Sequence, residues 1–405
     1  MFHRLRKSQA NLVKIEDLIN QWSVEPLFVR VAVEGEEPQL SLADKEEVKA
    51  ERYDAIRGCV GTIQQLLREN ETHFCIDVKI KRSSRRWRNY LRHVDYIISD
   101  ALLLTIACSI GYLLDQTDIT KPITSLFDVK LELFHPNIIF EPSLEKTIVN
   151  NFYDIMCGLV TDVYNIATLI DRVAQDQDDK NTYLDIVTSH EELSELKRML
   201  LERVDSVITK ANKEKMSFSK YSNIWTESRP NFLFYFLKFA RQLDEEEMIK
   251  FREDEKLVKP CEPTLEKFKE KIDYYESLYT EVEQVKKTKL FDEWFRVDLR
   301  PFRQTLLNEI KRWSWIFKKH LLDNVVDELQ DMHTFLERAD KELSVEVKEG
   351  DYESLVKVMK ILQCIRERTN KYDGMFEPMQ ERINLLRTYN VEIPDQSIDQ
   401  MEVLR

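Results

Sequence analysis

The fold of this chain is decided by residues 298–390, which read DLRPFRQTLLNEIKRWSWIFKKHLLDNVVDELQDMHTFLERADKELSVEVKEGDYESLVKVMKILQCIRERTNKYDGMFEPMQERINLLRTYN. Pro301 suits the first turn of a helix, which needs no amide donor, and Gly350 suits a helix end, where a left-handed residue is common. The stretch therefore predicts one helix from Pro301 to Glu349, about 70 Å long at about 1.5 Å per residue. Its apolar side chains recur at steps of three or four, which places them on one side of that helix: Phe302, Leu306, Ile310, Trp313, Phe317, Leu321, Val325, Leu329, Met332, Leu336, Ala339, Leu343 and Val347.

A helix of this length needs partner helices to bury its apolar side. Gly350 and Asp351 interrupt the pattern, and apolar periodicity resumes after them. Glycine takes positive φ at little cost, and Asp351 is a good cap for a following helix. We expect the chain to reverse here, with two shorter helices folding back so that the long helix is covered by Leu355, Val358, Met359 and Leu362.

Several stretches, taken in order, resemble one protein family. No single piece is a chemical signature, but the ordered series is specific and covers nearly the whole chain. The stretches are Trp22-Ser23 with Pro26-Leu27-Phe28, Phe140–Leu144, Phe268–Glu276, Trp294–Phe302, Trp313–Leu321, Gly350–Val356, and Met375–Met379 with Ile383–Tyr389. In this order they resemble the tail region of axonemal dynein heavy chains, most closely the outer-arm beta type.

The composition favours an all-α protein. The 405 residues include only seven glycines and eleven prolines, while 43% are hydrophobic and 33% are charged. Few helix breakers and long segments of helical period predict an elongated stack of antiparallel helical bundles. We expect a helical bundle with a small β-hairpin over residues 1–145, a second bundle over 146–260, and a long-helix bundle over 261–405.

One segment has the period of a β-strand instead. Phe127, Val129, Leu131 and Leu133 alternate with polar residues, which is typical of a strand with one buried face. His135-Pro136-Asn137 provides a turn, and Ile138-Ile139-Phe140 provides a second arm. The sequence therefore predicts one small hairpin near residues 127–140.

Signals for catalysis or ligand binding are weak. No Gly-Lys pair occurs, and Gly58 and Gly61 lie within a helical pattern, so a phosphate-binding loop is not expected. Asp176-Gln177-Asp178-Asp179 lacks the glycine and the final glutamate of a calcium loop, and the six cysteines are at least sixteen residues apart. We therefore expect no catalytic residues, no cofactor-binding or metal site, and hence no cofactor.

Nucleic-acid and membrane binding are not expected either. The net charge of −13 disfavours contacts with phosphates. The least polar run, Ala101–Leu114, is uncharged for only fourteen residues, whereas a bilayer-spanning helix needs about twenty. We interpret this run as a buried helix.

A basic cluster departs from this acidic background. It comprises Lys79, Lys81, Arg82, Arg85, Arg86, Arg88 and Arg92, interleaved with Trp87 and Tyr90. One interpretation is a contact for an acidic partner, such as tubulin or a neighbouring subunit, with Trp87 as an anchor. The other is a loop and the polar side of a helix whose Trp87, Tyr90, Leu91 and Val94 face the core. We name Lys81, Arg82, Arg85, Arg86 and Arg88 as possible partner-binding residues.

Two tryptophans in the long helix are expected to differ. Trp313 lies on the apolar side and is expected in the core. Trp315 is about 200° further around the helix, so it faces another way and is the better candidate for a partner contact.

The resemblance implies a function that the residues alone do not. It implies a non-catalytic stem, a stiff helical rod that carries force between motor and doublet microtubule in the axoneme of a cilium or flagellum. The implied partners are dynein intermediate and light chains, neighbouring heavy chains and, indirectly, doublet microtubules. In dyneins ATP hydrolysis belongs to motor modules, which are not expected in this chain. The alternative is a stand-alone helical scaffold or tethering protein.

Overall fold

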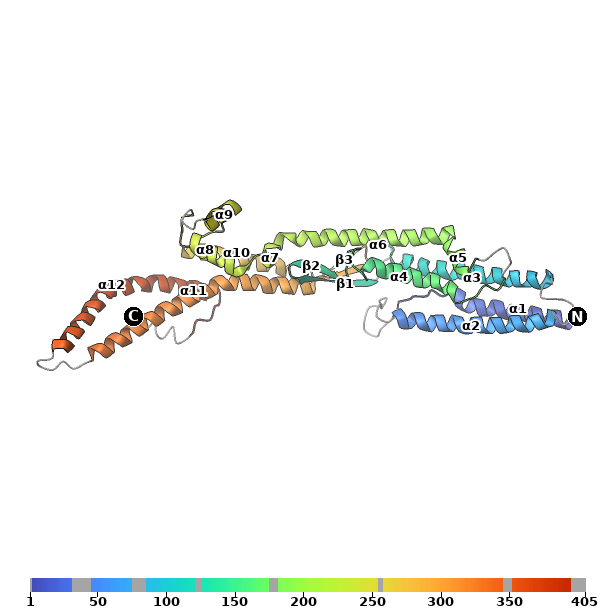
Figure 1. Ribbon diagram of the computed structural model, residues 1–405, viewed down its shortest axis with the longest axis horizontal. Helices are drawn as coiled ribbons and strands as arrows, with labels where there is room; N and C mark the ends of the chain where they lie inside the picture. Colours follow the sequence, from blue (N-terminus) through green and yellow to red (C-terminus); the bar gives the residue numbers. More distant parts are fainter. Residues whose placement is uncertain are drawn as a thin grey trace. The chain divides into compact units, whose positions relative to one another are not determined.

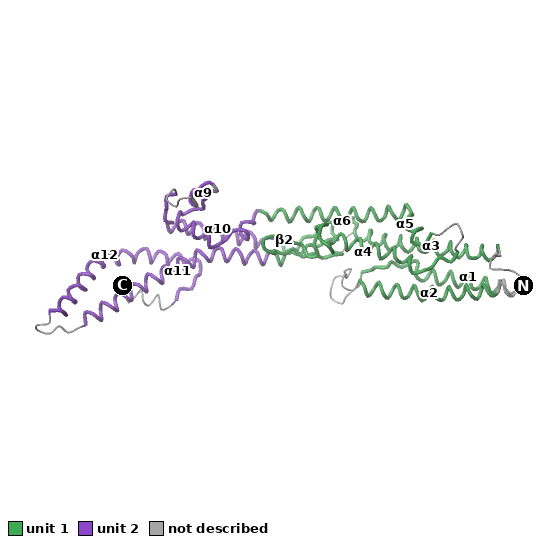
Figure 2. Tube along the Cα trace, viewed as in Figure 1, with its two compact units in different colours: residues 1–219, 286–302 green, residues 220–285, 303–405 purple. Residues whose placement is uncertain are grey.

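The fold is given by a computed structural model (Figure 1), which describes residues 2–30, 45–74, 85–120, 125–174, 181–253, 258–344 and 352–394. Most of these residues are helical, which confirms the predicted all-α class, and one small four-stranded sheet is formed among them. The chain divides into two compact units (Figure 2). Unit 1 comprises residues 1–219 and 286–302, and unit 2 comprises residues 220–285 and 303–405. The three-part division expected from the sequence stays a prediction.

Unit 1 begins with three long helices, α1 (Phe2–Ser23), α2 (Lys45–Phe74) and α3 (Arg85–Gln116). α1 packs against both α2 and α3. Apolar residues at helical spacing give each helix a buried side. These residues are Ile15, Ile19 and Trp22 in α1, Ile56, Val60, Ile63 and Leu67 in α2, and Val94, Ile98, Leu102, Ile106 and Ile110 in α3.

Helix α3 contains the apolar run singled out in the sequence. Over Trp87–Gln116 it is long and apolar enough to cross a membrane, the one such helix among the described residues. Half of its most apolar window is buried within the protein, and α3 contacts α1, α4, α5 and α6. Its polar groups also bond inside unit 1, because the Thr105 hydroxyl donates to the Ser23 carbonyl at 3.2 Å and the Ser109 hydroxyl accepts from the Leu27 amide at 3.1 Å. These contacts are those of a buried core helix.

The other helices of unit 1 follow the hairpin in the chain. They are α4 (Phe152–Asn165), the 3-10 turn η1 (Ile166–Thr168), α5 (Tyr183–Thr188), α6 (Glu191–Ser217) and the 3-10 turn η2 (Phe218–Tyr221), the last extending into unit 2. Polar residues begin two of them. The Asn151 side chain accepts from the Asp154 amide at 2.9 Å, and Thr182 and Asp185 form a reciprocal capping box.

The predicted hairpin is present but is only half of a mixed sheet. β1 (Phe127–Phe134) pairs antiparallel with β2 (Asn137–Glu141), as expected, but β1 also pairs in parallel with β4 (Phe295–Asp298), which pairs antiparallel with β3 (Thr288–Phe291). The strand order is β2-β1-β4-β3. β3 and β4 lie outside the one hairpin that the sequence predicts. Arg296 Nε reaches across the parallel pair to Asp128 Oδ1 at 2.8 Å.

Unit 2 contains α7 (Asn223–Thr226), α8 (Arg229–Phe239), α9 (Glu245–Glu253), α10 (Leu265–Glu283), α12 (Tyr352–Thr388) and all but the first residues of α11 (Arg300–Leu343). Its core is rich in aromatic rings. Phe317 is fully buried, and its ring centroid lies 5.2 Å from that of Phe236 and 6.1 Å from that of Phe232. Phe268 and Tyr275 of α10 complete this cluster.

The long helix predicted from Pro301 to Glu349 is confirmed as α11 over Arg300–Leu343. Most of its predicted apolar side is buried, but Leu336 and Leu343 are exposed. The predicted turn at Gly350 and Asp351 lies outside the described residues. The two shorter helices expected after it are instead one helix of 37 residues, α12, which continues through Pro378.

The predicted inward side of α12 is also wrong at its N-terminal end. Leu355, Met359 and Leu362 are 45, 63 and 51% exposed, so they do not cover α11. Residues further along α12 do so: Tyr372, Met375, Phe376, Met379 and Ile383 pack around Val325, Leu329 and Met332 of α11.

Candidate functional site

The basic cluster is described only in part. Lys79, Lys81 and Arg82 lie outside the described residues, and the side chain of Arg86 is not described. Arg85 and Arg88 are exposed in the first turns of α3. The role of these residues in partner binding stays a prediction.

Of the two aromatic residues within the cluster, Trp87 is buried and Tyr90 is half-buried. Trp87 is buried, and its ring stacks on that of Tyr90 with centroids 5.5 Å apart. The Tyr90 hydroxyl accepts a hydrogen bond from Asn70 Nδ2 at 2.7 Å, and Asn70 Oδ1 accepts one from Asn11 Nδ2 at 3.0 Å. Burial raises the pKa of Tyr90. These hydrogen bonds join α1, α2 and α3 through Asn11, Asn70 and Tyr90. Because Trp87 is buried, it does not project from unit 1 as an anchor.

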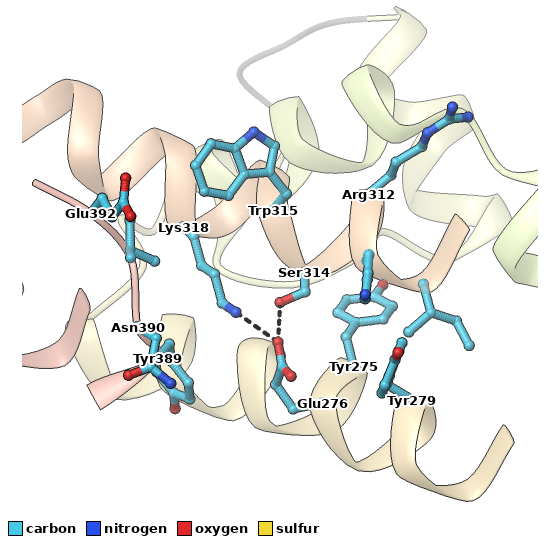
Figure 3. A pocket seen from close by; sticks show the side chains of 13 residues that line it. Tyr275, Glu276, Tyr279, Arg312, Ser314, Trp315, Lys318, Tyr389, Asn390 and Glu392 are labelled. Atoms are coloured by element: carbon cyan, nitrogen blue, oxygen red, sulfur yellow. Dashed lines mark hydrogen bonds and ion pairs between the residues drawn. The ribbon is translucent and has the colours of Figure 1, made fainter. Parts of the chain in front are cut away.

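The two tryptophans of α11 separate as expected. Trp313 is 1% exposed, and its indole N–H donates to the Ile224 carbonyl at 2.6 Å. Trp315 is 47% exposed and lies beside a pocket of about 760 Å³ in unit 2 (Figure 3). This pocket is the candidate site.

Helices α10 and α11 and the segment after α12 form the pocket. α10 contributes Tyr275, Glu276 and Tyr279, and α11 contributes Lys311, Trp315 and Lys318 among others. The segment from Tyr389 to Glu392 lines the remaining side. The residues therefore come from positions more than a hundred apart in the chain.

An ion pair lies at the centre of the pocket. Glu276 Oε1 accepts hydrogen bonds from Lys318 Nζ at 2.6 Å and from the Ser314 hydroxyl at 2.7 Å (Figure 3). Burial acts to raise the pKa of Glu276, but the bonds from Lys318 and Ser314 outweigh it, so the pKa is lowered. Glu276 is thus held as a carboxylate, so it has no proton to donate as a general acid.

Aromatic rings and cations form the rest of the lining. Lys318 Nζ lies 5.2 Å from the ring centroid of Tyr389, and Lys311 Nζ lies 5.0 Å from that of Tyr279. The Tyr389 hydroxyl donates to Asp273 at 2.6 Å, and burial, followed by this bond, raises the pKa of Tyr389. The pocket presents rings and a few fixed charges, which suits the binding of a partner side chain.

No group of three or more His, Cys, Asp or Glu side chains among the described residues is placed to bind a metal ion. Gly58 and Gly61 both lie inside α2, as the helical pattern predicted.

Sequence reasoning named Trp315 but missed its neighbours. Tyr275, Tyr279, Lys311 and Tyr389 have no spacing that links them in the sequence. A signal was nevertheless present, because three of the stretches that carry the dynein resemblance, Phe268–Glu276, Trp313–Leu321 and Ile383–Tyr389, meet at this pocket.

Comparison with known proteins supports the resemblance over the whole chain. The chain is 35% identical over 401 residues to the ciliary dynein beta chain of Tripneustes gratilla, and 34% identical over 401 residues to human dynein axonemal heavy chain 9; each match takes in 99% of the chain. The flagellar outer-arm dynein beta chain of Chlamydomonas reinhardtii is 23% identical over 87% of the chain. No family model matches.

The chain is therefore a homologue of one segment of the axonemal dynein heavy chains. Within that class the relatives named above include beta chains of ciliary and flagellar outer-arm type, in agreement with the resemblance seen in the sequence. Their ciliary, axonemal and flagellar descriptions also confirm the expected axonemal setting. The chain spans only 9% of the length of the first two relatives.

Proposed function

We propose that this chain is a non-catalytic stem segment of an axonemal dynein heavy chain. In this role it is a stiff helical rod that carries force between the motor and the doublet microtubule. It also supports assembly with intermediate and light chains and with neighbouring heavy chains. Neither nucleic acid nor membrane is a partner in this proposal.

The observation that carries the proposal is the extent of the similarity. A match over 99% of the chain to a single 9% segment of heavy chains is continuous, not a short shared motif. A stand-alone scaffold or tethering protein that shares only a bundle pattern is not expected to match one family in this way. The long helix α11 also suits a load-bearing element, because its 44 residues run without a break.

The non-catalytic part of the proposal rests on the chemistry of the candidate site. Glu276 is engaged by Lys318 and Ser314, and the pocket contains no cysteine, serine or threonine beside a histidine that would activate it. The sequence also lacks the Gly-Lys pair of a phosphate-binding loop. We therefore expect no specific ATP turnover by the purified chain.

Co-precipitation from ciliary extract tests the assembly role. The tagged chain is expected to recover a dynein intermediate chain or an adjacent heavy-chain tail. Trp315→Ala is expected to weaken that recovery, whereas Tyr96→Ala, which removes a 67% exposed ring from α3, serves as the matched control. Recovery of a vesicle tether and of neither dynein subunit would favour the alternative. ATP turnover that survives purification would overturn the non-catalytic assignment.

A further inference from the structure

The N-terminal half of α12 has apolar side chains on two sides, whose centres are roughly 140° apart around the helix. On one side, Arg368 lies 5.0 Å from the ring centroid of Phe335 in α11, and Tyr372 lies 5.3 Å from it. Val358, Ile361 and Ile365 share this side and are half-buried. The other side, which we name the outer face, carries Tyr352, Leu355, Val356, Met359 and Leu362, which are 77, 45, 49, 63 and 51% exposed.

The spacing shows that the outer face is a true helix face. At about 100° per residue, Met359 and Ile361 differ by about 200° around the helix. The steps from Tyr352 through Leu355, Val356 and Met359 to Leu362 are three or four residues, the period of an apolar side that packs on a neighbour. A helix that packs on one partner needs one such side, and α12 has two. An apolar patch of this kind on a protein surface marks an interaction site.

The charges on this half of α12 indicate the kind of partner. Residues 355–366, which hold most of the outer face, include three basic side chains and no acidic one, whereas the whole chain has a net charge of −13. At about 100° per residue, Arg366 lies within the outer face and Lys360 lies at its edge. A second copy that docks through the same face would bring like charges together, which disfavours it. An acidic partner is attracted to the same surface.

We propose that the outer face binds an acidic amphipathic helix of another subunit. This helix would add a third member to the pair formed by α11 and α12, in the way that helical bundles bury a remaining apolar side. Its apolar residues at i, i+3, i+4 and i+7 would cover Leu355, Met359 and Leu362, and its flanking Glu or Asp residues would face Lys360 and Arg366. This inference extends the proposed assembly function, and it depends on that function only for the expectation that the partner is a dynein subunit.

Two synthetic peptides test the chemistry of this surface. Both carry leucines at i, i+3, i+4 and i+7; one has glutamate at the flanking positions and the other has lysine. Fluorescence anisotropy with the full chain is expected to show binding of the acidic peptide and at least tenfold weaker binding of the basic one. No binding of the acidic peptide at 100 µM, or equal binding of both, would overturn the proposal.

Variants locate the binding on α12. Met359→Gln combined with Leu362→Gln is expected to weaken the acidic peptide at least tenfold. Because both side chains are already exposed, the far-UV circular dichroism should not change. Met216→Gln, which alters a 69% exposed methionine of α6, is the matched control and should bind as the unmodified chain does. Equal binding by the double variant would refute the assignment to the outer face.

Two other occupants give different results. Sedimentation that shows a dimer lost in the double variant would mean that a second copy covers the face. Cosedimentation with phosphatidylserine vesicles that the double variant abolishes would mean that a membrane does. Either result overturns the proposal.

The source of the partner is tested separately. A benzophenone amino acid at position 359 captures the neighbour in ciliary extract, and the crosslinked peptide is sequenced. An acidic helix from a dynein subunit supports both the surface and the proposed function. An acidic helix from an unrelated protein would leave the surface standing and count against the function. If dynein subunits co-precipitate equally with the double variant and with the unmodified chain, the proposed function stands and the assignment of binding to the outer face is contradicted.

Discussion

Trp313→Phe should lower the free energy of unfolding far more than Trp315→Phe does. Trp313 is 1% exposed, and its indole N–H is bonded to the Ile224 carbonyl at 2.6 Å. Phenylalanine leaves that buried carbonyl without this donor, which costs about 1–3 kcal/mol. The smaller ring also leaves a void of roughly 40 Å³, or about 1 kcal/mol at ~24 cal/mol per Å³. The free energy of unfolding should therefore fall by about 2–4 kcal/mol.

Trp315→Phe is the control for this prediction. Its side chain is 47% exposed, and surface substitutions usually change stability by less than about 0.5 kcal/mol. Urea unfolding followed by far-UV circular dichroism measures both variants. Because the chain has two compact units, the whole curve is compared and not one midpoint alone. Equal shifts in the two variants would refute the assignment of Trp313 to the core and Trp315 to the surface.

Three further predictions concern individual contacts. Asn70→Leu removes a fully buried amide that bonds both Asn11 and Tyr90, so unfolding free energy should fall by about 1–3 kcal/mol in urea titrations; no change would mean that these bonds do not tie the three helices. Gly61→Ala should raise the free energy of unfolding by about 0.5–1 kcal/mol, because Gly61 lies inside α2 with open space around an added Cβ. A lower free energy of unfolding in this variant would mean that glycine is required there. Burial lowers the pKa of His320, so the unfolded chain binds the proton more readily. The stability that depends on neutral His320 is fully present above the unfolded pKa of about 6.5 and is lost as pH falls below it. Urea midpoints between pH 7.5 and 5.5 should fall less in His320→Phe than in the unmodified chain, and identical slopes would contradict this.

The sequence was informative wherever a period extended over several turns. The buried side of α11, from Phe302 to Met332, could be listed residue by residue because a long helix repeats its pattern many times. The hairpin was also visible, since Phe127, Val129 and Leu131 alternate with polar residues. β3 and β4 were missed because strands of four residues are too short to show alternation, and a parallel pairing with β1 leaves no local sequence signal.

The orientation of α12 could not be predicted from the sequence for a different reason. In α12 apolar residues occupy two sides, so periodicity alone did not indicate which side faces α11. Leu355 and Met359 were assigned inward and lie outward, while Ile361 and Ile365 have the opposite orientation. The candidate site was limited in the same way: exposure of Trp315 followed from its helical angle, but no pattern indicated that Tyr279 and Tyr389 would lie beside it.

The parallel pairing of β1 with β4 has a consequence for the order in which the chain folds. Asp128 and Arg296, which bond across that pair, are separated by 168 residues. At about 5–20 residues per second, a ribosome makes β4 roughly 8–34 s after β1. During that interval the hairpin of β1 and β2 has an unpaired edge, which is a site of misassociation for a nascent chain. The sheet of unit 1 can therefore be completed only after β3 and β4 are made, and both follow the inserted segment 220–285 in the chain. Nascent chains that end before residue 288 should therefore depend most strongly on chaperones.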